Sequence, residues 1–85
     1  MSIKYSEYRF VFDDVQFGID LRERRASKPL TQKQVGELIG HESGAICTAL
    51  ENGRYERHLM MCDFMALCLL FDLHPFDYFD LQRSE

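Results

Sequence analysis

The stretch that decides the fold is LTQKQVGELIGHESGAICTALENG, residues 30–53. Thr31, followed three residues later by a glutamine, has the pattern of a capping box that begins a helix. Gly40 allows the left-handed backbone that ends a helix. Ser43 is a favourable N-cap for a second helix, over about residues 43–51, which Asn52-Gly53 ends. The stretch therefore predicts two short helices joined by a turn, which is the layout of a helix-turn-helix.

Similar start signals predict three further helices outside this stretch. Asp13 begins a helix over about residues 14–26, with Phe12 placed to contact its first turn as a hydrophobic staple. Another helix covers about residues 59–71 and is apolar almost all round, so we expect it to be covered on every side. Pro75 suits the first position of a fifth helix.

The first twelve residues lie outside this helical pattern. Aromatic residues stand at every second position from Tyr8 to Phe12, which suits a short strand or an extended arm. The 85 residues leave room for one domain. We therefore predict an all-α fold with five helices, divided into an N-terminal arm or strand over residues 1–12 and a helix-turn-helix domain over residues 13–81.

The composition excludes several classes of protein. With 46% hydrophobic and 28% charged residues, the chain should fold and not stay disordered. It has no apolar run of about 18 residues and no secretory signal at its start, so we expect a cytoplasmic protein without membrane contact. The net charge of −4 excludes a uniformly basic surface. Residues 21–58 nevertheless sum to +2, whereas residues 1–20 sum to −2 and residues 59–85 to −4.

The cysteines and histidines give no sign of a metal site or an enzyme. Cys47, Cys62 and Cys68 are odd in number and follow no signal peptide, so we expect free, mostly buried thiols in a reducing cytosol. Six-residue steps place Cys62, Cys68 and His74 on different helix faces, which disfavours a shared metal ion. No phosphate-binding loop, cysteine–histidine pair or paired carboxylates stand out. We predict no cofactor, no metal and no enzymatic activity.

Taken together, the motifs resemble the XRE/Cro-type, phage-repressor-like family of helix-turn-helix proteins. That family shows the pattern fG..LR..R, then lSQ.eLA..lG, then an isoleucine-bearing helix that ends in E-N-G. The matching residues are Phe17-Gly18, Leu21-Arg22, Arg25, Leu30-Thr31-Gln32, Val35-Gly36, Ile39-Gly40 and Glu51-Asn52-Gly53. The resemblance covers about residues 17–79 and implies a five-helix, lambda-repressor-like fold. Two departures are a turn over Gly40–Ser43 that is one residue longer than usual, and Gly36 in place of the usual alanine.

The resemblance implies a sequence-specific DNA-binding transcriptional regulator, with repression as its expected mode. The third helix would enter the major groove, and the second would lie across the DNA backbone. The predicted DNA contacts are Gln32, Lys33, Ser43, Gly44, Ala45, Thr48, Asn52, Arg54, Tyr55 and Arg57. For Gln32 and for the loop after Asn52, an ordinary solvated surface is the alternative. Ile46 either touches thymine methyl groups or belongs to the core.

Two further expectations concern structure and assembly. Arg25 and Glu51 match family positions that pair between helices, so we assign them to a structural ion pair. Because one small domain reads few bases, we expect a homodimer on double-stranded DNA, formed through residues 1–12 or through the apolar excess of the last two helices. The alternative function is a protein-interaction module on the same fold, which binds a toxin, a polymerase subunit or another regulator and has little or no affinity for DNA.

Overall fold

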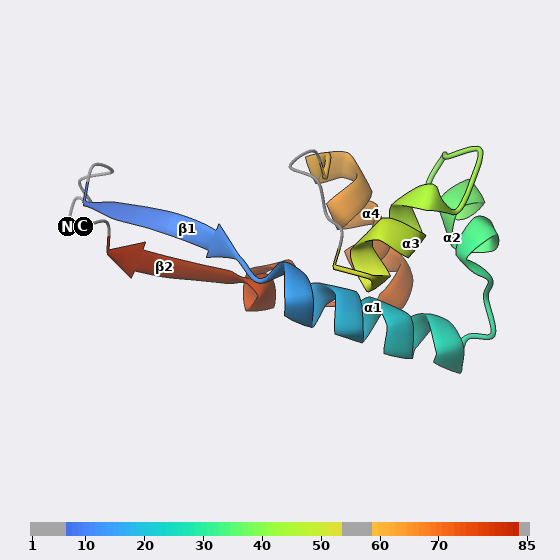
Figure 1. Cartoon of the computed structure of the whole chain (residues 1–85), viewed down its shortest axis with the longest axis horizontal. Helices are drawn as coiled ribbons and strands as arrows, with labels where there is room; N and C mark the ends of the chain where they lie inside the picture. The colour runs from blue at the N-terminus through green and yellow to red at the C-terminus, as the bar shows by residue number, and fades with distance from the viewer. Residues whose placement is uncertain (1–6, 54–58, 84–85) are drawn as a thin grey trace.

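The structure is a computed structural model that describes residues 7–53 and 59–83. Within these ranges, four α-helices pack together, and two strands form a ribbon that projects from them (Figure 1). The elements are, in chain order, β1 (Tyr8–Phe12), α1 (Asp14–Ser27), α2 (Gln32–Leu38), α3 (Ala45–Glu51), α4 (Met61–Phe71), the 3-10 turn η1 (Pro75–Tyr78) and β2 (Phe79–Arg83). The fold is therefore mostly helical, as predicted, but the sheet corrects the all-α assignment.

The first helix, α1, begins close to the predicted position because Asp13 caps it. The Asp13 carboxylate accepts a hydrogen bond from the backbone N–H of Gln16 at 3.0 Å. The rings of Phe12 and Phe17 lie 5.7 Å apart, which is the contact expected of a hydrophobic staple. The backbone N–H of Asp13 also donates to the carbonyl oxygen of Tyr78 at 2.7 Å. The start of α1 is thus tied both to β1 and to η1.

The helix α2 has the full capping box that its sequence predicts. The Thr31 hydroxyl accepts from the backbone N–H of Gln34 at 3.1 Å, and the Gln34 side chain accepts from the N–H of Thr31 at 2.8 Å. After α2 the chain turns at Gly40, whose φ of 91° lies in the region that glycine adopts without steric cost. The predicted limits of this helix are confirmed to within one or two residues.

The helix α3 begins two residues later than predicted. Gly44, not Ser43, is the N-cap residue, and it makes no side-chain cap. The Ser43 hydroxyl accepts only from the backbone N–H of Ala45, at 3.3 Å. Gly44 takes the cap position because its backbone packs against α2, where an added Cβ would lie 2.6 Å from the carbonyl carbon of Gln32. Close helix contact therefore overrides the better capping residue.

The predicted fifth helix is wrong. Pro75 begins a single 3-10 turn, after which the chain runs directly into β2. This strand pairs antiparallel with β1, so that Phe12 lies opposite Phe79 and Tyr8 opposite Arg83. Apolar and polar residues alternate in β2, and the pairing satisfies backbone groups that a lone arm would leave to water. Residues 79–83 therefore form a strand of the ribbon and not part of a helix.

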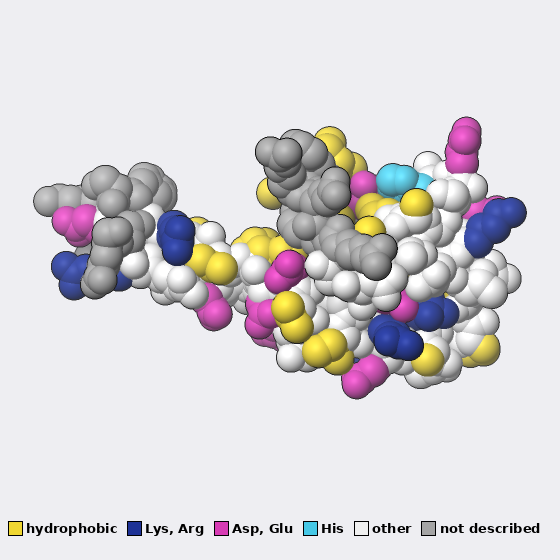
Figure 2. Space-filling view, in the orientation of Figure 1, with side chains coloured by type: hydrophobic (Ala, Val, Ile, Leu, Met, Phe, Trp, Pro, Cys, Tyr) yellow, Lys and Arg dark blue, Asp and Glu magenta, His cyan; other side chains and the backbone are white. Residues whose placement is uncertain are grey.

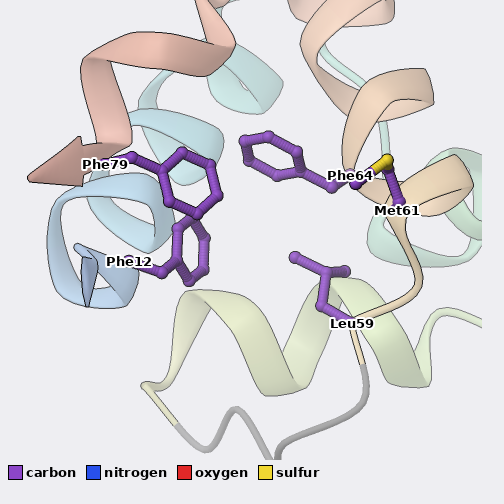
Figure 3. A pocket seen from close by; sticks show the side chains of 5 residues that line it. All are labelled: Phe12, Leu59, Met61, Phe64 and Phe79. Carbon is purple, nitrogen blue, oxygen red and sulfur yellow. The ribbon is translucent and has the colours of Figure 1, made fainter. Parts of the chain in front are cut away.

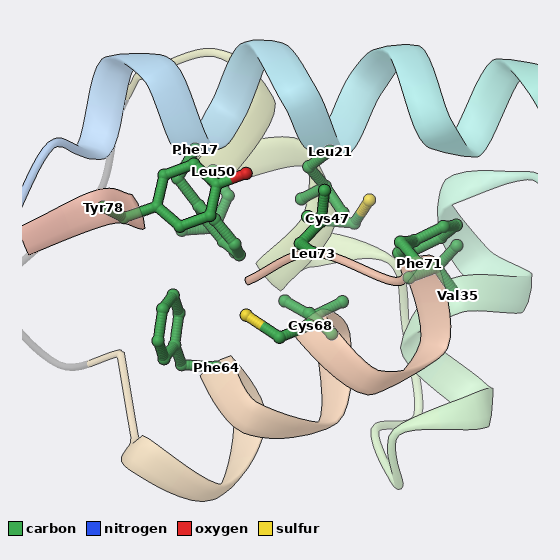
Figure 4. Close-up of a cluster of buried hydrophobic side chains, with 11 residues drawn as sticks. Phe17, Leu21, Val35, Cys47, Leu50, Phe64, Cys68, Phe71, Leu73 and Tyr78 are labelled. Carbon is green, nitrogen blue, oxygen red and sulfur yellow. The ribbon is translucent and has the colours of Figure 1, made fainter. Parts of the chain in front are cut away.

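The hydrophobic core lies between α1, α2, α3 and α4 (Figure 4). The largest side chains that are fully buried are Phe17, Phe71, Leu21, Leu67, Val35 and Cys47. Since each of the four helices supplies at least one of them, the core fixes the two motif helices against α1 and α4. Two of the three thiols predicted to be mostly buried, Cys47 and Cys68, lie in the core, whereas Cys62 is exposed.

A cluster of aromatic rings joins the ribbon to this core. The rings of Phe12 and Phe64 pack edge-to-face with their centroids 5.4 Å apart, and those of Phe17 and Tyr78 do the same at 5.0 Å. The Tyr78 hydroxyl donates to the Asp20 carboxylate at 2.7 Å. Burial is the main cause that raises the pKa of Tyr78 above its ordinary value, and the hydrogen bond to the Asp20 carboxylate raises it further. The hydroxyl therefore stays protonated and keeps η1 attached to α1.

The helix α4 is covered on one side only. It begins at Met61, two residues later than predicted, and ends at Phe71, followed by the C-cap residue Asp72, whose φ of 56° is left-handed. Its inner side chains are buried, whereas Met61, Met65 and Leu69 on its other side are exposed. The expectation that this helix is covered on every side is wrong for the single chain. No helix among the described residues is both long enough and apolar enough to cross a membrane.

Gly36 lies where α2 meets the turn that leads into α3. An added Cβ would overlap the carbonyl oxygen of Ser43 and lie 2.8 Å from the carbonyl carbon of the same residue. Both contacts are to backbone, which cannot rotate away as a flexible side chain can. The glycine in place of alanine is thus a requirement of this turn, whose backbone runs directly over α2.

We expect Gly36→Ala to destabilise the protein by about 1–3 kcal/mol, because the overlap with backbone outweighs the roughly 1 kcal/mol gain in helix propensity. Urea unfolding followed by circular dichroism measures the change. Glu37→Ala is the control, because Glu37 is the next residue of α2 and is exposed, whereas Gly36 is buried. It should alter stability by less than about 0.5 kcal/mol. Equal stability of Gly36→Ala and the wild type would show that the turn moves away freely.

Candidate nucleic-acid interface

The two motif helices begin next to each other. The backbone of Gly44, at the start of α3, packs on that of Gln32 and Lys33, at the start of α2. The first turns of both helices, and the side chains that they carry, therefore share one region of the surface. This arrangement is what the predicted helix-turn-helix requires.

An ion pair below this surface fixes α2 and α3 relative to α1. The Arg25 guanidinium bonds the Glu51 carboxylate twice, with Nε to Oε2 at 2.7 Å and Nη2 to Oε1 at 3.0 Å. Its remaining nitrogen donates to the carbonyl oxygen of Leu30 at 2.9 Å. One side chain from α1 thus fixes both Leu30, two residues before α2 begins, and Glu51, the last residue of α3. The pairing assigned from the sequence is present.

The Glu51 carboxylate is nearly inaccessible, with 3% of its side chain exposed. Burial by itself would raise the pKa of Glu51, but hydrogen bonds from Arg25 and Cys47, together with the charge of Arg25, outweigh it and leave the pKa below its usual value. The Cys47 thiol donates to Oε2 at 2.8 Å. Burial and this bond raise the pKa of Cys47 to about 12, so the thiol stays protonated.

Two of the predicted DNA contacts bond each other. The Thr48 hydroxyl lies 2.7 Å from Oε1 of Gln32 and 3.0 Å from the carbonyl oxygen of Gly44. The Gln32 amide nitrogen lies 3.4 Å from Oε1 of Glu51. Gln32 therefore bridges α2 and α3, and both it and Thr48 are only half-buried. Gln32 is therefore hydrogen-bonded at the protein surface, and its contact with DNA stays a prediction.

The remaining predicted contacts divide by exposure. Lys33, Ser43, Ala45 and Asn52 are exposed, and Gly44 is half-buried. Ile46, for which core and DNA were both open, is half-buried and packs against the core. The other three predicted contacts, Arg54, Tyr55 and Arg57, lie outside the described residues. The structure thus brings together around the start of α3 a set of small side chains, beside one lysine.

Sequence reasoning missed the contact that anchors the longer turn. His41 Nε2 lies 2.9 Å from the Asp63 carboxylate of α4. The two residues are 22 positions apart and belong to separate predicted elements, so no spacing in the sequence pairs them. The bond holds the turn between α2 and α3 against α4, which positions the first residues of α3.

The surface near this site carries both signs of charge. Figure 2 shows lysine and arginine side chains interspersed with acidic ones over the helical body. No group of three or more metal-ligating side chains occurs among residues 7–53 and 59–83. The described site therefore offers a helix with a small-residue surface and a nearby cation.

We expect Glu51→Gln to destabilise the fold by about 2 kcal/mol at pH 7, because the amide places an N–H group against donors and leaves Arg25 without its counter-charge. Since the pKa of Glu51 is lowered on folding, its stabilisation is complete above about pH 4.5 and is lost as the pH falls through the folded-state pKa. The difference between variant and wild type should therefore shrink below about pH 4.5.

Urea unfolding at pH 7 and at several values below pH 4.5 measures this difference. Glu23→Gln, at an exposed position of α1, controls for the titration of other carboxylates. A penalty for Glu51→Gln that stays constant down to pH 3 would contradict an ionised Glu51 as the stabilising partner.

Comparison with known proteins gives one structural match. No protein-family model matches the chain, and no curated protein matches it. Among solved structures it is similar to the restriction-modification controller protein C.AhdI from Aeromonas hydrophila, with 29% sequence identity and a TM-score of 0.60. The match covers 76% of this chain and 94% of the controller protein. It confirms the resemblance seen in the motifs: the chain has the fold of the XRE/Cro-type helix-turn-helix proteins.

Proposed function

We propose that this protein is a sequence-specific, DNA-binding transcriptional regulator. The observation that carries the proposal is the geometry of α2 and α3, whose first turns meet at the surface while Arg25 and Glu51 hold the helices from beneath. The likeness to a restriction-modification controller protein supports a regulatory role. In this proposal α3 enters the major groove and α2 lies across the DNA backbone.

Small side chains suit α3 to a close approach to bases. Ala45 and Ser43 are exposed at its start, and Thr48 lies one turn further on. Methyl groups of alanine and threonine make apolar contacts with the methyl group of thymine, whereas a serine hydroxyl bonds either a donor or an acceptor. The described part of α3 has no arginine to bond guanine, so we propose that thymine contacts and DNA shape contribute much of the specificity.

Phosphate contacts come from residues around this helix. Lys33 is exposed on the first turn of α2 and supplies a cation. We propose that Gln32 acts through its bonds to Thr48 and Glu51, by fixing α3 relative to α2. From their sequence position after Asn52, we propose that Arg54, Tyr55 and Arg57 contact the adjoining backbone.

The finer parts of the proposal concern assembly and mode of action. We propose a homodimer on double-stranded DNA, because two copies of α3 read successive major grooves about 34–36 Å apart. We propose that binding at an operator represses transcription, in a reducing cytoplasm, without a cofactor and without enzymatic activity. The exposed Cys62 and the buried Cys47 and Cys68 are free thiols, which fits such a compartment.

We expect Ala45→Glu to weaken DNA binding at least 100-fold, because a carboxylate at the start of α3 would face phosphates and bases. The substitution should leave the fold intact, since the position is exposed and acidic residues stabilise the first turn of a helix. Fluorescence anisotropy on duplexes selected from a random pool measures the affinity. Val15→Glu, which adds the same charge to the exposed first turn of α1, is the matched control and should change affinity less than about tenfold.

Salt dependence tests the phosphate contacts separately. The logarithm of the binding constant should fall linearly with the logarithm of salt concentration between about 50 and 200 mM. We expect Lys33→Ala to reduce the magnitude of that slope by about 1. Arg22→Ala on the exposed surface of α1 should leave the slope unchanged. No binding to any duplex at about 50 mM salt would contradict the proposed function.

That negative result would favour a second candidate, a protein-interaction module on the same fold. The observations in its favour are the net charge of −4 and the many large apolar side chains that the chain exposes. Recovery of one protein at a fixed stoichiometry, by a chain that binds no DNA, would distinguish the two candidates.

A further inference from the structure

Between the Tyr8–Arg83 pair at its tip and Phe12 at its base, one face of the ribbon is apolar, and it is open to solvent at Phe10 and Leu81. Because cross-strand partners point to the same side of a sheet, the pairs Phe10–Leu81 and Phe12–Phe79 share one face, whereas Arg9–Gln82 and Val11–Asp80 share the other. Phe10 is 67% exposed and Leu81 46% exposed. A two-stranded ribbon is marginally stable by itself, and a packed apolar face is what usually stabilises one. This face is therefore built to be covered.

The apolar face continues from the ribbon onto α4. Phe79 from β2 and Met61 and Phe64 from α4 line a pocket of about 210 Å³ at the foot of the ribbon, together with Phe12 and Leu59 (Figure 3). From Met61 the exposed side of α4 runs through Met65 to Leu69, at the four-residue spacing of one helix face. We call the surface formed by Phe10, Leu81, Phe79, Met61, Met65 and Leu69 the apolar band.

The apolar band is larger than a monomer normally exposes. Its six side chains are between 39% and 87% exposed, and at about 200 Å² for each fully exposed side chain they present roughly 700 Å². The largest apolar patch on a monomer is typically about 300–600 Å². A standard protein interface buries about 800 Å² on each partner. The area thus fits one interface of standard size.

The chemistry of the apolar band fits a second copy of the same chain. Its pocket is smaller than the roughly 300 Å³ at which small-molecule sites begin, and its lining is apolar, so it fits a hydrophobic side chain. The same band carries a protruding aromatic ring, Phe10. A surface that carries both a protruding apolar side chain and an apolar pocket can be complementary to a second copy of itself about a two-fold axis.

We propose that the apolar band is a homodimer interface, in which the ribbon of one protomer packs on the ribbon and on α4 of its partner. This deepens the proposed homodimer by naming its surface. Figure 2 shows the apolar side chains on the ribbon and where the ribbon meets the helices. The interface lies on elements other than α2 and α3, so dimerisation leaves the candidate DNA-binding helices accessible.

Sedimentation velocity on the full chain without DNA tests the proposal, because its outcome does not depend on DNA binding. The wild type, at 10.0 kDa per chain, should sediment as a dimer at tens of micromolar. Leu81→Glu places a charge in the apolar band and should raise the dissociation constant at least tenfold. Gln82→Glu, the adjacent residue on the opposite face of β2, makes a comparable change outside the band and should dimerise like the wild type.

Leu69→Glu gives a second test at the far end of the apolar band, and a helical position keeps the test independent of whether β2 tolerates Leu81→Glu. It too should raise the dissociation constant at least tenfold while the circular dichroism spectrum stays unchanged. A wild type that remains monomeric at all concentrations up to about 1 mM would overturn the proposal. So would equal dimerisation of Leu69→Glu and the wild type, or a mass that grows without limit as concentration rises.

Discussion

The fold depends on the hydrogen bonds that one carboxylate, that of Glu51, accepts below the protein surface. Glu51 ends α3, is almost fully buried, and receives hydrogen bonds from Arg25 on α1, Cys47 on α3 and Gln32 on α2. A buried charge is tolerated only when partners surround it, so this group fixes three helices relative to one another. The position of α3 at the surface results from that constraint together with the close backbone contacts at Gly36 and Gly44.

The features that the sequence predicts well are those encoded over a few residues. The capping box of α2 and the Asp13 cap of α1 depend on side chains three residues apart, and both are present. Serine is a better capping residue than glycine, so the sequence predicts Ser43 as the N-cap of α3. Gly44 is the N-cap instead, because the packing of its backbone on Gln32 decides where α3 begins. The prediction of a fifth helix is wrong because proline suits the first position of a 3-10 turn as well as that of an α-helix. Residues 79–83 form a strand because they pair with β1, and this pairing is not encoded locally.

The candidate site shows the same division. The ordered motif predicted Lys33 and Ala45 at the start of the two helices and Ser43 just before the second, and all three are exposed. The pairing of Arg25 with Glu51 came from matching family positions. The bond between Gln32 and Thr48 and the contact of His41 with Asp63 depend on the relative placement of whole helices. No spacing in the sequence encodes either contact, so both emerge only when the packed structure is known.

The pairing of β1 with β2 joins the two ends of the described chain, and this affects the order of folding. Helices form from neighbours in the sequence, but the ribbon forms only when the chain between residues 12 and 79 has been brought into a closed loop. Contacts of such high sequence separation are costly in chain entropy before they gain anything in return. In the folded chain, the contacts of Tyr78 with Asp20 and with the backbone N–H of Asp13 hold the start of β2 beside the end of β1. A nascent chain on the ribosome therefore cannot complete its ribbon until residues 79–83 have emerged.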